Sequence, residues 1–208
     1  MRMTVFDVET TGLVAREEDI IEVGIAHFDD GVMTDSHGCL VKPTKTISKK
    51  ITAITGITNK DVRKKGYPWK KAAISVKNHL ESADIWCGQN IDFDIGFITE
   101  GLKRLDMELE VKPYVDTMRV ARRFIPSSEL RSKSLGKLAA HFGVDLENSH
   151  RALHDCIATG EVLIEMCEVF EVSIEDLLSP KALTIGPYNI GKDPFEALYS
   201  GMPRYRTY

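Results

Sequence analysis

The stretch FDVETTGL, residues 6–13, places two acidic side chains at the end of an apolar segment that begins at Met3. The segment has the composition of a β-strand, and a Thr-Thr-Gly turn follows it. Side chains two residues apart on a strand share a face, so Asp7 and Glu9 point the same way, about 7 Å apart. Burial of two like charges is costly unless a cation or a hydrogen-bonded loop compensates them. This stretch alone therefore predicts either a metal site or a capped strand end.

The residues around this stretch predict a mixed sheet covered by helices. Residues 19–31 and 32–43 alternate apolar and polar side chains, and a turn at Asp30-Gly31 joins them, which predicts two further strands. Loop and short helix are expected in 42–70, with TGIT at 55–58 as a turn and helix cap. Later patterns predict a strand in 83–90, a strand and helical turn in 113–124, and helices in 71–82, 92–105, 134–144 and 151–170. This order is typical of an α/β fold with a mixed five-stranded sheet flanked by helices.

The composition is that of an ordinary folded domain, with 43% hydrophobic and 28% charged residues in a chain of 208. No apolar run approaches the roughly 20 residues that cross a bilayer, and acidic residues from position 7 onward do not fit a signal peptide. The four cysteines lack the spacing of a zinc or disulfide motif. We therefore expect a soluble, cytoplasmic protein with reduced thiols and no membrane partner.

A basic stretch lies between Lys42 and Lys71, with ten Lys and Arg residues and a single acid, Asp61. Its charge of +9 leaves −13 for the rest of a chain whose net charge is −4. Such a stretch indicates either a polyanionic partner or a solvated surface. Tyr67 and Trp69 lie among the lysines, and this modestly favours nucleic acid because aromatic side chains stack on bases. A second basic cluster comprises Arg119, Arg122, Arg123, Arg131 and Lys133.

Two later segments supply further acids and a histidine. Asp94, in NIDFD, lies in the first turn of an expected helix that follows a buried strand. Sites of α/β sheets gather at such strand ends, although the helix dipole alone also favours acids there. His150 and Asp155 lie in HRALHD, and they can face one site only if His150 belongs to the loop before the helix. Taken alone, His150 is better explained as a surface histidine, since a lone histidine usually is one.

In order and in local context, FDVETTGL, NIDFD and HRALHD resemble the three exonuclease motifs of the DEDDh family. These are the DnaQ-like 3′-to-5′ exonucleases, which include proofreading subunits of bacterial DNA polymerases. The resemblance covers roughly residues 1–175. A related class has tyrosine in place of the histidine, so His150 favours the histidine class. TGIT also resembles a family segment near the 3′ end of the substrate, although many members have a histidine where this chain has Thr55.

The resemblance implies an RNase H-like fold and phosphodiester hydrolysis with two Mg²⁺ or Mn²⁺ ions. Asp7, Glu9 and Asp155 would surround one ion, and Asp7 and Asp94 would hold the other. His150 would be the general base, a role that suits the ordinary histidine pKa of about 6.5. The residues implied to contact substrate are Thr10, Thr11, Gly12, Leu13, Thr55, Ile57, Asn90 and Phe93. Capping of a turn is an equally good interpretation of Asn90.

The partner implied by the resemblance is a nucleic acid with a 3′ end. Single-stranded DNA is favoured, RNA is an option, and a DNA polymerase subunit is a further candidate partner; the products would be nucleoside 5′-monophosphates. One alternative function is a 3′-to-5′ exoribonuclease of the RNase T or oligoribonuclease type. Another is a non-catalytic RNase H-like module that binds nucleic acid or a polymerase. We assign residues 1–180 to the exonuclease domain and residues 181–208, which lack a clear period, to a tail of unknown role.

Overall fold

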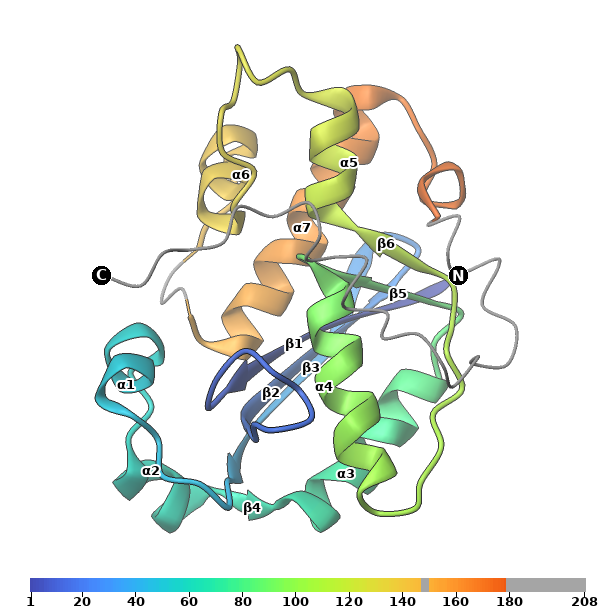
Figure 1. Cartoon of the computed structure of the whole chain (residues 1–208). Helices are drawn as coiled ribbons and strands as arrows, with labels where there is room; N and C mark the ends of the chain where they lie inside the picture. Colours follow the sequence, from blue (N-terminus) through green and yellow to red (C-terminus); the bar gives the residue numbers. More distant parts are fainter. Residues whose placement is uncertain (147–149, 179–208) are drawn as a thin grey trace.

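The computed structural model describes residues 1–146 and 150–178. Its mixed sheet has the strand order β4-β3-β2-β1-β5-β6 (Figure 1). The strands are β1 (Arg2–Thr10), β2 (Ile20–Asp29), β3 (Val32–Lys42), β4 (Tyr67–Pro68), β5 (Ile85–Gly88) and β6 (Tyr114–Asp116). The first three strands pair antiparallel, whereas β5 runs parallel to β1 and β6 parallel to β5. The carboxyl ends of β1, β5 and β6 therefore meet at one edge of the sheet.

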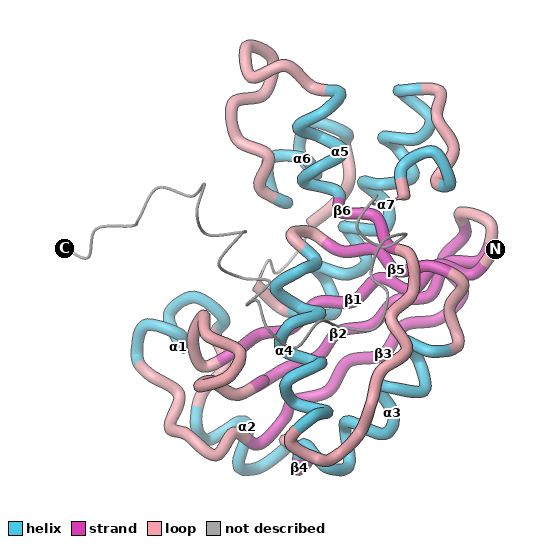
Figure 2. Tube along the Cα trace, turned by 45° about the vertical axis from the view of Figure 1, so that its right-hand side comes forward, coloured by secondary structure: helices cyan, strands magenta, loops and turns pink. Residues whose placement is uncertain are grey.

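Helices pack on both faces of this sheet (Figure 2). They are α1 (Lys49–Thr55), α2 (Asn59–Lys65), α3 (Trp69–Glu81), α4 (Ile91–Lys103), α5 (Thr117–Phe124), α6 (Leu135–Phe142) and α7 (Ala152–Phe170), followed by the 3₁₀ turn η1 (Glu175–Leu177). Phe6 and Val8 of β1 belong to the core under α3 and α4. Met3 and Val5 belong to the core under α5, α6 and α7. Alternation along β1 thus assigns successive side chains to two different cores.

The predicted α/β fold is confirmed, and its five longer strands are joined by the two-residue strand β4 beside β3. Residues 42–70 hold two short helices instead of one. Gly56 ends α1 with a φ of 71°, and Thr58 begins α2 with a capping box, so the turn-and-cap interpretation of TGIT is confirmed. Helix α3 begins at Trp69, two residues before the expected helix and directly after Pro68.

The close approach of α7 to β2 depends on Gly24. A Cβ atom at this position would lie 2.3 Å from the carbonyl carbon and oxygen of Ala152, in the first turn of α7. Gly24 is also the residue that pairs with Asp7 across the β1–β2 ladder. Because glycine has no side chain, α7 can begin directly over this pair of strands. The amino end of α7 is thereby brought beside Asp7.

Among residues 1–146 and 150–178, no helix combines the length and the apolar composition that a bilayer crossing requires. The predicted tail, residues 181–208, lies outside the described residues, as do residues 179 and 180 of the predicted domain.

Candidate active site

Asp7 and Glu9 extend the row of β1 side chains that faces α7. Met3 and Val5 of this row are buried in the core under α7. The next two positions of the row, toward the carboxyl end of the strand, are the two acids, and both are half-buried. The strand geometry therefore confirms that the two carboxylates share a face.

Asp94 reaches the same edge of the sheet from the first turn of α4. Its side chain is 3% exposed, and Oδ1 accepts a hydrogen bond of 2.9 Å from the N–H of Val8. The parallel pairing of β1 with β5 ends at Val5 and Cys87, before this point. The carboxylate thus binds the β1 backbone just past the end of the ladder, between the two acids of β1.

The loop before α7 and the first turn of that helix carry the last two predicted residues. His150 lies in the loop with a φ of 66°, and Asp155 lies in the first turn. The N–H of His150 donates a hydrogen bond of 3.1 Å to Asp155 Oδ2. A positive φ is uncommon for histidine, and this bond stabilises it. The arrangement is the one that the sequence required for both residues to face one site.

These residues form one electrostatic cluster. Glu9, His150 and Asp155 offer ligand atoms that all lie within 4.8 Å of one another. Burial, and then the charge of Asp155, raises the pKa of Asp7 to about 8. Burial, and then the charge of Asp7, raises the pKa of Glu9 to about 8, and the same two causes raise the pKa of Asp94. Four ionised carboxylates at this edge therefore require a compensating positive charge.

The donor set fits a hard divalent cation. Asp155 Oδ1 is buried and has no hydrogen-bond partner among the described residues. A buried polar atom without a partner is costly, and a cation at this edge would satisfy it. Carboxylate oxygens are the ligands that Mg²⁺ and Mn²⁺ prefer. The residues present are therefore suited to the ions that the motif resemblance implies.

The turn after β1 borders the carboxylates. Thr11 holds the turn, because its N–H donates to Asp19 O at 2.9 Å and its hydroxyl accepts from Asp19 N–H at 2.9 Å. Thr10 is buried, and its hydroxyl donates to Gly12 O at 2.5 Å. Leu13, in contrast, is 73% exposed. The turn is therefore braced by its own hydroxyl groups and presents one apolar side chain to solvent.

The other predicted contact residues lie in two further turns. Thr55 and Ile57 are buried in the turn between α1 and α2, where Thr55 Oγ1 accepts a 3.1 Å hydrogen bond from Ile57 N–H. Asn90 precedes α4 with a φ of 62° and makes no capping hydrogen bond with its side chain, while its N–H donates to Asp116 Oδ1 at 3.2 Å. Phe93 is half-buried in the first turn of α4. Contact between these four residues and a substrate stays a prediction.

An ion pair that the sequence did not predict anchors the loop of His150. Glu22 of β2 pairs with Glu9 across the ladder and is only 4% exposed. Its carboxylate accepts hydrogen bonds from the Arg151 guanidinium, the shortest at 2.7 Å, and from Ala152 N–H at 3.0 Å. Arg151 and Ala152 directly follow His150, so the pair fixes the segment that carries the histidine. The sequence feature that could have indicated this pair is Glu22 itself, an acid within the apolar strand pattern DIIEVGI.

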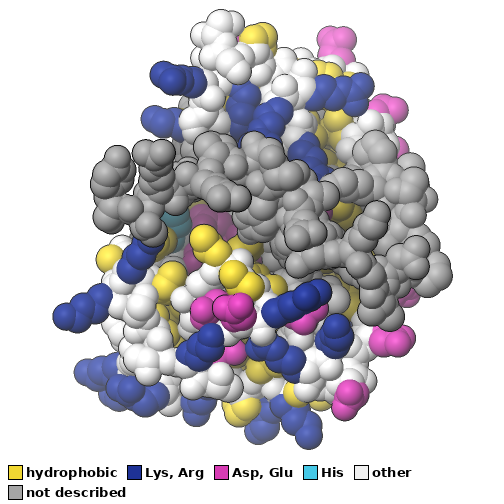
Figure 3. All heavy atoms as spheres, viewed as in Figure 1, with side chains coloured by type: hydrophobic (Ala, Val, Ile, Leu, Met, Phe, Trp, Pro, Cys, Tyr) yellow, Lys and Arg dark blue, Asp and Glu magenta, His cyan; other side chains and the backbone are white. Residues whose placement is uncertain are grey.

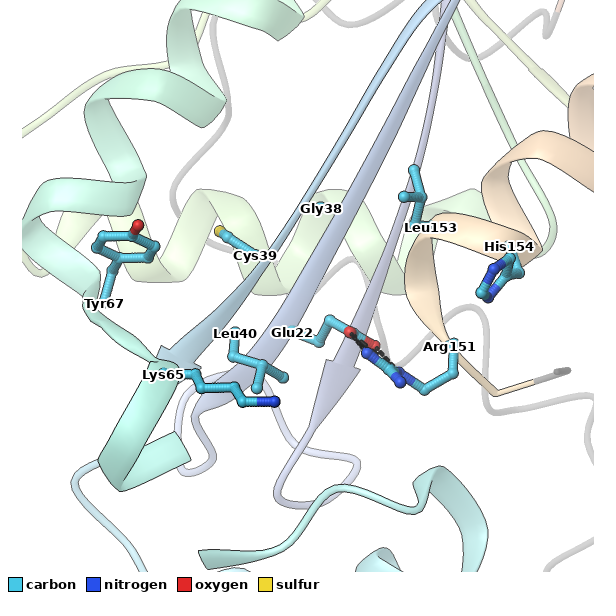
Figure 4. Close-up of a pocket in the computed structure, with 9 residues that line it drawn as sticks. All are labelled: Glu22, Gly38, Cys39, Leu40, Lys65, Tyr67, Arg151, Leu153 and His154. Carbon is cyan, nitrogen blue, oxygen red and sulfur yellow. Dashed lines mark hydrogen bonds and ion pairs between the residues drawn. The ribbon is translucent and has the colours of Figure 1, made fainter. Parts of the chain in front are cut away.

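The same ion pair lines a pocket of about 350 Å³ (Figure 4). The pocket is lined by Glu22, Gly38, Cys39, Leu40, Lys65, Tyr67, Arg151, Leu153 and His154. Figure 4 shows Glu22 and Arg151 reaching toward each other from β2 and from the start of α7. Because Glu22 lies directly opposite Glu9 in the ladder, the pocket flanks the carboxylate cluster on the β3 side.

The basic stretch from Lys42 to Lys71 includes α1, α2, β4 and the start of α3. Figure 3 shows Lys and Arg side chains gathered over α1 and α2 at the lower left of that face. Trp69 faces inward, with Nε1 donating a 2.7 Å hydrogen bond to a backbone carbonyl, whereas Tyr67 is 56% exposed. In the second basic cluster, Arg119 forms an ion pair with Asp92. The first stretch therefore offers the larger free basic surface, with one exposed aromatic ring.

Residues 4–163 match the family model described as exonuclease. The chain is 37% identical over 160 residues to DNA polymerase III PolC-type of Clostridium perfringens, which is 76% of this chain and 11% of that protein. It is 34% identical over 170 residues to the DNA polymerase III PolC-type of Oceanobacillus iheyensis, again covering 11% of the relative. The chain thus spans about a tenth of the length of these curated relatives.

Solved structures show the same fold. Exonuclease X, in complex with 5′ overhanging duplex DNA, superposes with a TM-score of 0.66 at 24% identity, over 84% of this chain and 96% of that one. E. coli Exonuclease I, in complex with a dT13 oligonucleotide, gives a TM-score of 0.71 at 19% identity, over 82% of this chain and 42% of that one. These neighbours confirm the RNase H-like fold. Since the family model covers residues 4–163, the chain belongs to the exonuclease family, within its DnaQ-like 3′-to-5′ group.

Proposed function

We propose that the chain is a metal-dependent 3′-to-5′ exonuclease that acts mainly on single-stranded DNA and releases nucleoside 5′-monophosphates. The observation that carries this proposal is the convergence of Glu9, His150 and Asp155, whose ligand atoms lie within 4.8 Å of one another. Asp7 and Asp94 belong to the same cluster, because the charge of Asp7 raises the pKa of both Glu9 and Asp94. Residues from β1, α4, α7 and the loop before α7 thus bring four acids and one histidine to a single edge of the sheet.

Four carboxylates, from Asp7, Glu9, Asp94 and Asp155, would hold two Mg²⁺ or Mn²⁺ ions. When bound, such ions neutralise phosphate charge, lower the pKa of water and help the leaving oxygen depart. The buried, unpartnered Oδ1 of Asp155 supports this assignment. The raised pKa values of Asp7 and Glu9 support it too, because carboxylates that resist ionisation when alone are those that a cation stabilises.

His150 would act as the general base that takes a proton from the attacking water. Its backbone is held by Asp155, yet the residue is exposed, so the imidazole remains accessible to a substrate at this edge. A base on a loop can adjust to a bound substrate, while the Glu22–Arg151 pair limits how far the loop moves. The chain therefore provides a positioned proton acceptor beside the carboxylates.

The 3′ end of the strand would be held by the turn from Thr10 to Leu13. Exposed Leu13 offers an apolar surface to the terminal base, and the braced backbone of Thr11 and Gly12 lies next to the acids. The basic stretch from Lys42 to Lys71 would bind phosphates further along the strand, which makes affinity dependent on salt. A role beside a DNA polymerase is part of this proposal, since the relatives from Clostridium and Oceanobacillus are DNA polymerases.

Digestion of matched oligonucleotides tests this proposal. Single-stranded DNA, duplex DNA and RNA, each labelled at the 5′ or the 3′ end, are incubated with and without Mg²⁺. The proposal predicts stepwise shortening from the 3′ end of single-stranded DNA, with Mg²⁺ required and mononucleotides released. Faster digestion of RNA would favour the exoribonuclease alternative. Absence of hydrolysis on every substrate, with Mg²⁺ or Mn²⁺, would favour the non-catalytic binding module.

A further inference from the structure

A cluster of three histidines lies on the face of the sheet opposite the carboxylate site. His27 of β2, His37 of β3 and His79 of α3 offer ring nitrogens that all lie within 4.8 Å of one another. Alternation along β2 assigns His27 to the side of Val23 and Ile25, which belong to the core under α3 and α4. The cluster is therefore separated from Asp7 and Glu9 by the thickness of the sheet.

The rings are close enough to share one ion. His27 Nε2 lies 2.9 Å from His79 Nδ1, and the rings of His37 and His79 have centroids 4.3 Å apart. Nitrogens that bind one tetrahedral Zn²⁺ at about 2.0 Å lie about 3.3 Å from one another. His37 is on the exposed strand β3 with 44% of its side chain exposed, so this ring can adjust. The other two nitrogens already have nearly the separation that a shared ion needs.

Outer hydrogen bonds orient two of the rings. Buried Thr4 Oγ1 lies 2.9 Å from His27 Nδ1. When Nδ1–H donates to this hydroxyl oxygen, Nε2 of the same ring carries a lone pair that is directed at His79. Asp35 Oδ2 lies 2.8 Å from His37 Nε2, which leaves Nδ1 of that ring as the available ligand atom. Hydroxyl and carboxylate partners on the far nitrogen are the usual support of ligating histidines. The two supports thus fix which nitrogen each ring presents.

We propose that His27, His37 and His79 form a binding site for one Zn²⁺ ion. Three neutral imidazoles suit zinc, and they do not suit Mg²⁺, which prefers oxygen ligands. Burial, followed by the charges of the neighbouring histidines, lowers the pKa of His27, and the same causes lower that of His79, so both favour the neutral form that binds metal. The ion would cross-link the β2–β3 hairpin to α3. We assign the ion a structural role, because His27 pairs with Thr4 on β1 and faces away from Asp7 and Glu9.

Titration of the full chain with Co²⁺, in excess Mg²⁺, tests the site. Mg²⁺ occupies the carboxylates, and Co²⁺ bound by imidazoles gives a visible absorption band. We expect one equivalent of Co²⁺ at this site, an affinity at least tenfold lower in His37→Gln, and a loss of tenfold or more in Asp35→Asn, the range typical of such supports. His141→Gln, which changes a histidine on α6, is the matched control and should bind as the unchanged protein does.

Thermal unfolding gives a second measurement that does not depend on activity. Zn²⁺ should raise the Tm of Asp155→Asn, in which the carboxylate cluster is weakened, and it should not raise the Tm of the double variant Asp155→Asn/His37→Gln. His37 is exposed, so its replacement is expected to fold, and nuclease activity in Mg²⁺ should stay unchanged. If Co²⁺ binding in excess Mg²⁺ persists in His37→Gln and His79→Gln, or if the Zn²⁺ effect on Tm persists when either substitution is combined with Asp155→Asn, the histidine site is overturned. If the chain showed no nuclease activity, the expected Co²⁺ binding and the expected effect of Zn²⁺ on Tm would be the same.

Discussion

Glu22 Oε1 accepts a 2.7 Å hydrogen bond from Arg151 Nη2, and this contact ties β2 to the residue that follows His150. The carboxylate of Glu22 also binds Ala152 N–H, so it holds both the loop and the first turn of α7. Burial of Glu22 shields the pair on one side, while half of the Arg151 side chain stays exposed. The position of the proposed general base is therefore set by a strand of the sheet.

Arg151→Ala should separate positioning from binding. Loss of the guanidinium leaves the buried Glu22 carboxylate with fewer partners, which should cost about 1–3 kcal/mol of stability. The loop of His150 would then be less well placed, and misplacement of a catalytic group costs about 10²-fold in rate. We expect kcat to fall by up to that factor with KM little changed. Lys103→Ala is the matched control, since Lys103 forms an exposed ion pair worth about 0–1 kcal/mol. Equal effects of the two substitutions would argue against a positioning role.

Gly24→Ala should displace α7. The new methyl group would lie 2.3 Å from the carbonyl group of Ala152, so helix or strand must shift. Overpacking of this kind costs about 1–3 kcal/mol, and the shift should also separate Asp155 from Asp7 and lower kcat. Gly136→Ala in α6 serves as control, because the nearest atom to its added Cβ is 4.0 Å away. That control should leave kcat unchanged and raise stability by up to about 1 kcal/mol. A Gly24→Ala protein with unaltered Tm and kcat would contradict the packing argument.

Replacement of His150 by alanine should lower kcat by about 10²–10⁴-fold, the range expected for loss of a general base. The rate of the unchanged protein should rise from acid to neutral pH, because a general base must be unprotonated to accept a proton, and the variant should lose that rise. Folding should be little affected, because His150 is exposed and is bound through its backbone. Measurement of kcat against pH for both proteins decides the role. Identical profiles of kcat against pH for the two proteins would show that His150 is not the general base.

Removal of metal should make stability depend on pH. Burial raises the pKa of Asp7 and of Glu9 to about 8, well above the values of about 4 in an unfolded chain. The neutral acids are therefore favoured by folding, and this stability is lost progressively as pH rises from the unfolded pKa of about 4 to the folded pKa of about 8. In EDTA, the free energy of unfolding should fall from about pH 5 to about pH 8, and less steeply in Asp7→Asn. Urea unfolding at a series of pH values measures this free energy. Parallel curves of unfolding free energy against pH for the two proteins would contradict these pKa values.

Much of the fold and of the acid cluster was predictable because the information is local. Asp7 and Glu9 are two residues apart on one strand, and Asp94 and His150 each follow a clear break between elements. The histidine cluster was not predictable, since His27, His37 and His79 are separated by 10 and 42 positions and match no ligand spacing. Such groups become visible only when the register of the sheet is known.

Other features depended on tertiary packing in the same way. Strand β4 has only two residues, Tyr67 and Pro68, and it exists because β3 offers a free edge to pair with. The Glu22–Arg151 pair joins positions 129 residues apart, and no local pattern links them. The sequence around Trp69, in contrast, indicated that its ring could stack on bases. The structure instead turns this ring inward, where Nε1 donates a hydrogen bond to the Gly101 carbonyl.

Turnover of a 3′-labelled single-stranded oligonucleotide with Mg²⁺, compared between the unchanged chain and Asp7→Asn, decides whether the carboxylate cluster is catalytic. Asn lacks the charge that a cation needs, and the substitution also removes a carboxylate whose pKa burial raises to about 8. We predict that hydrolysis falls below detection in Asp7→Asn, while its Tm in EDTA is equal to or higher than that of the unchanged chain. Near-normal turnover by a folded Asp7→Asn protein would contradict the account.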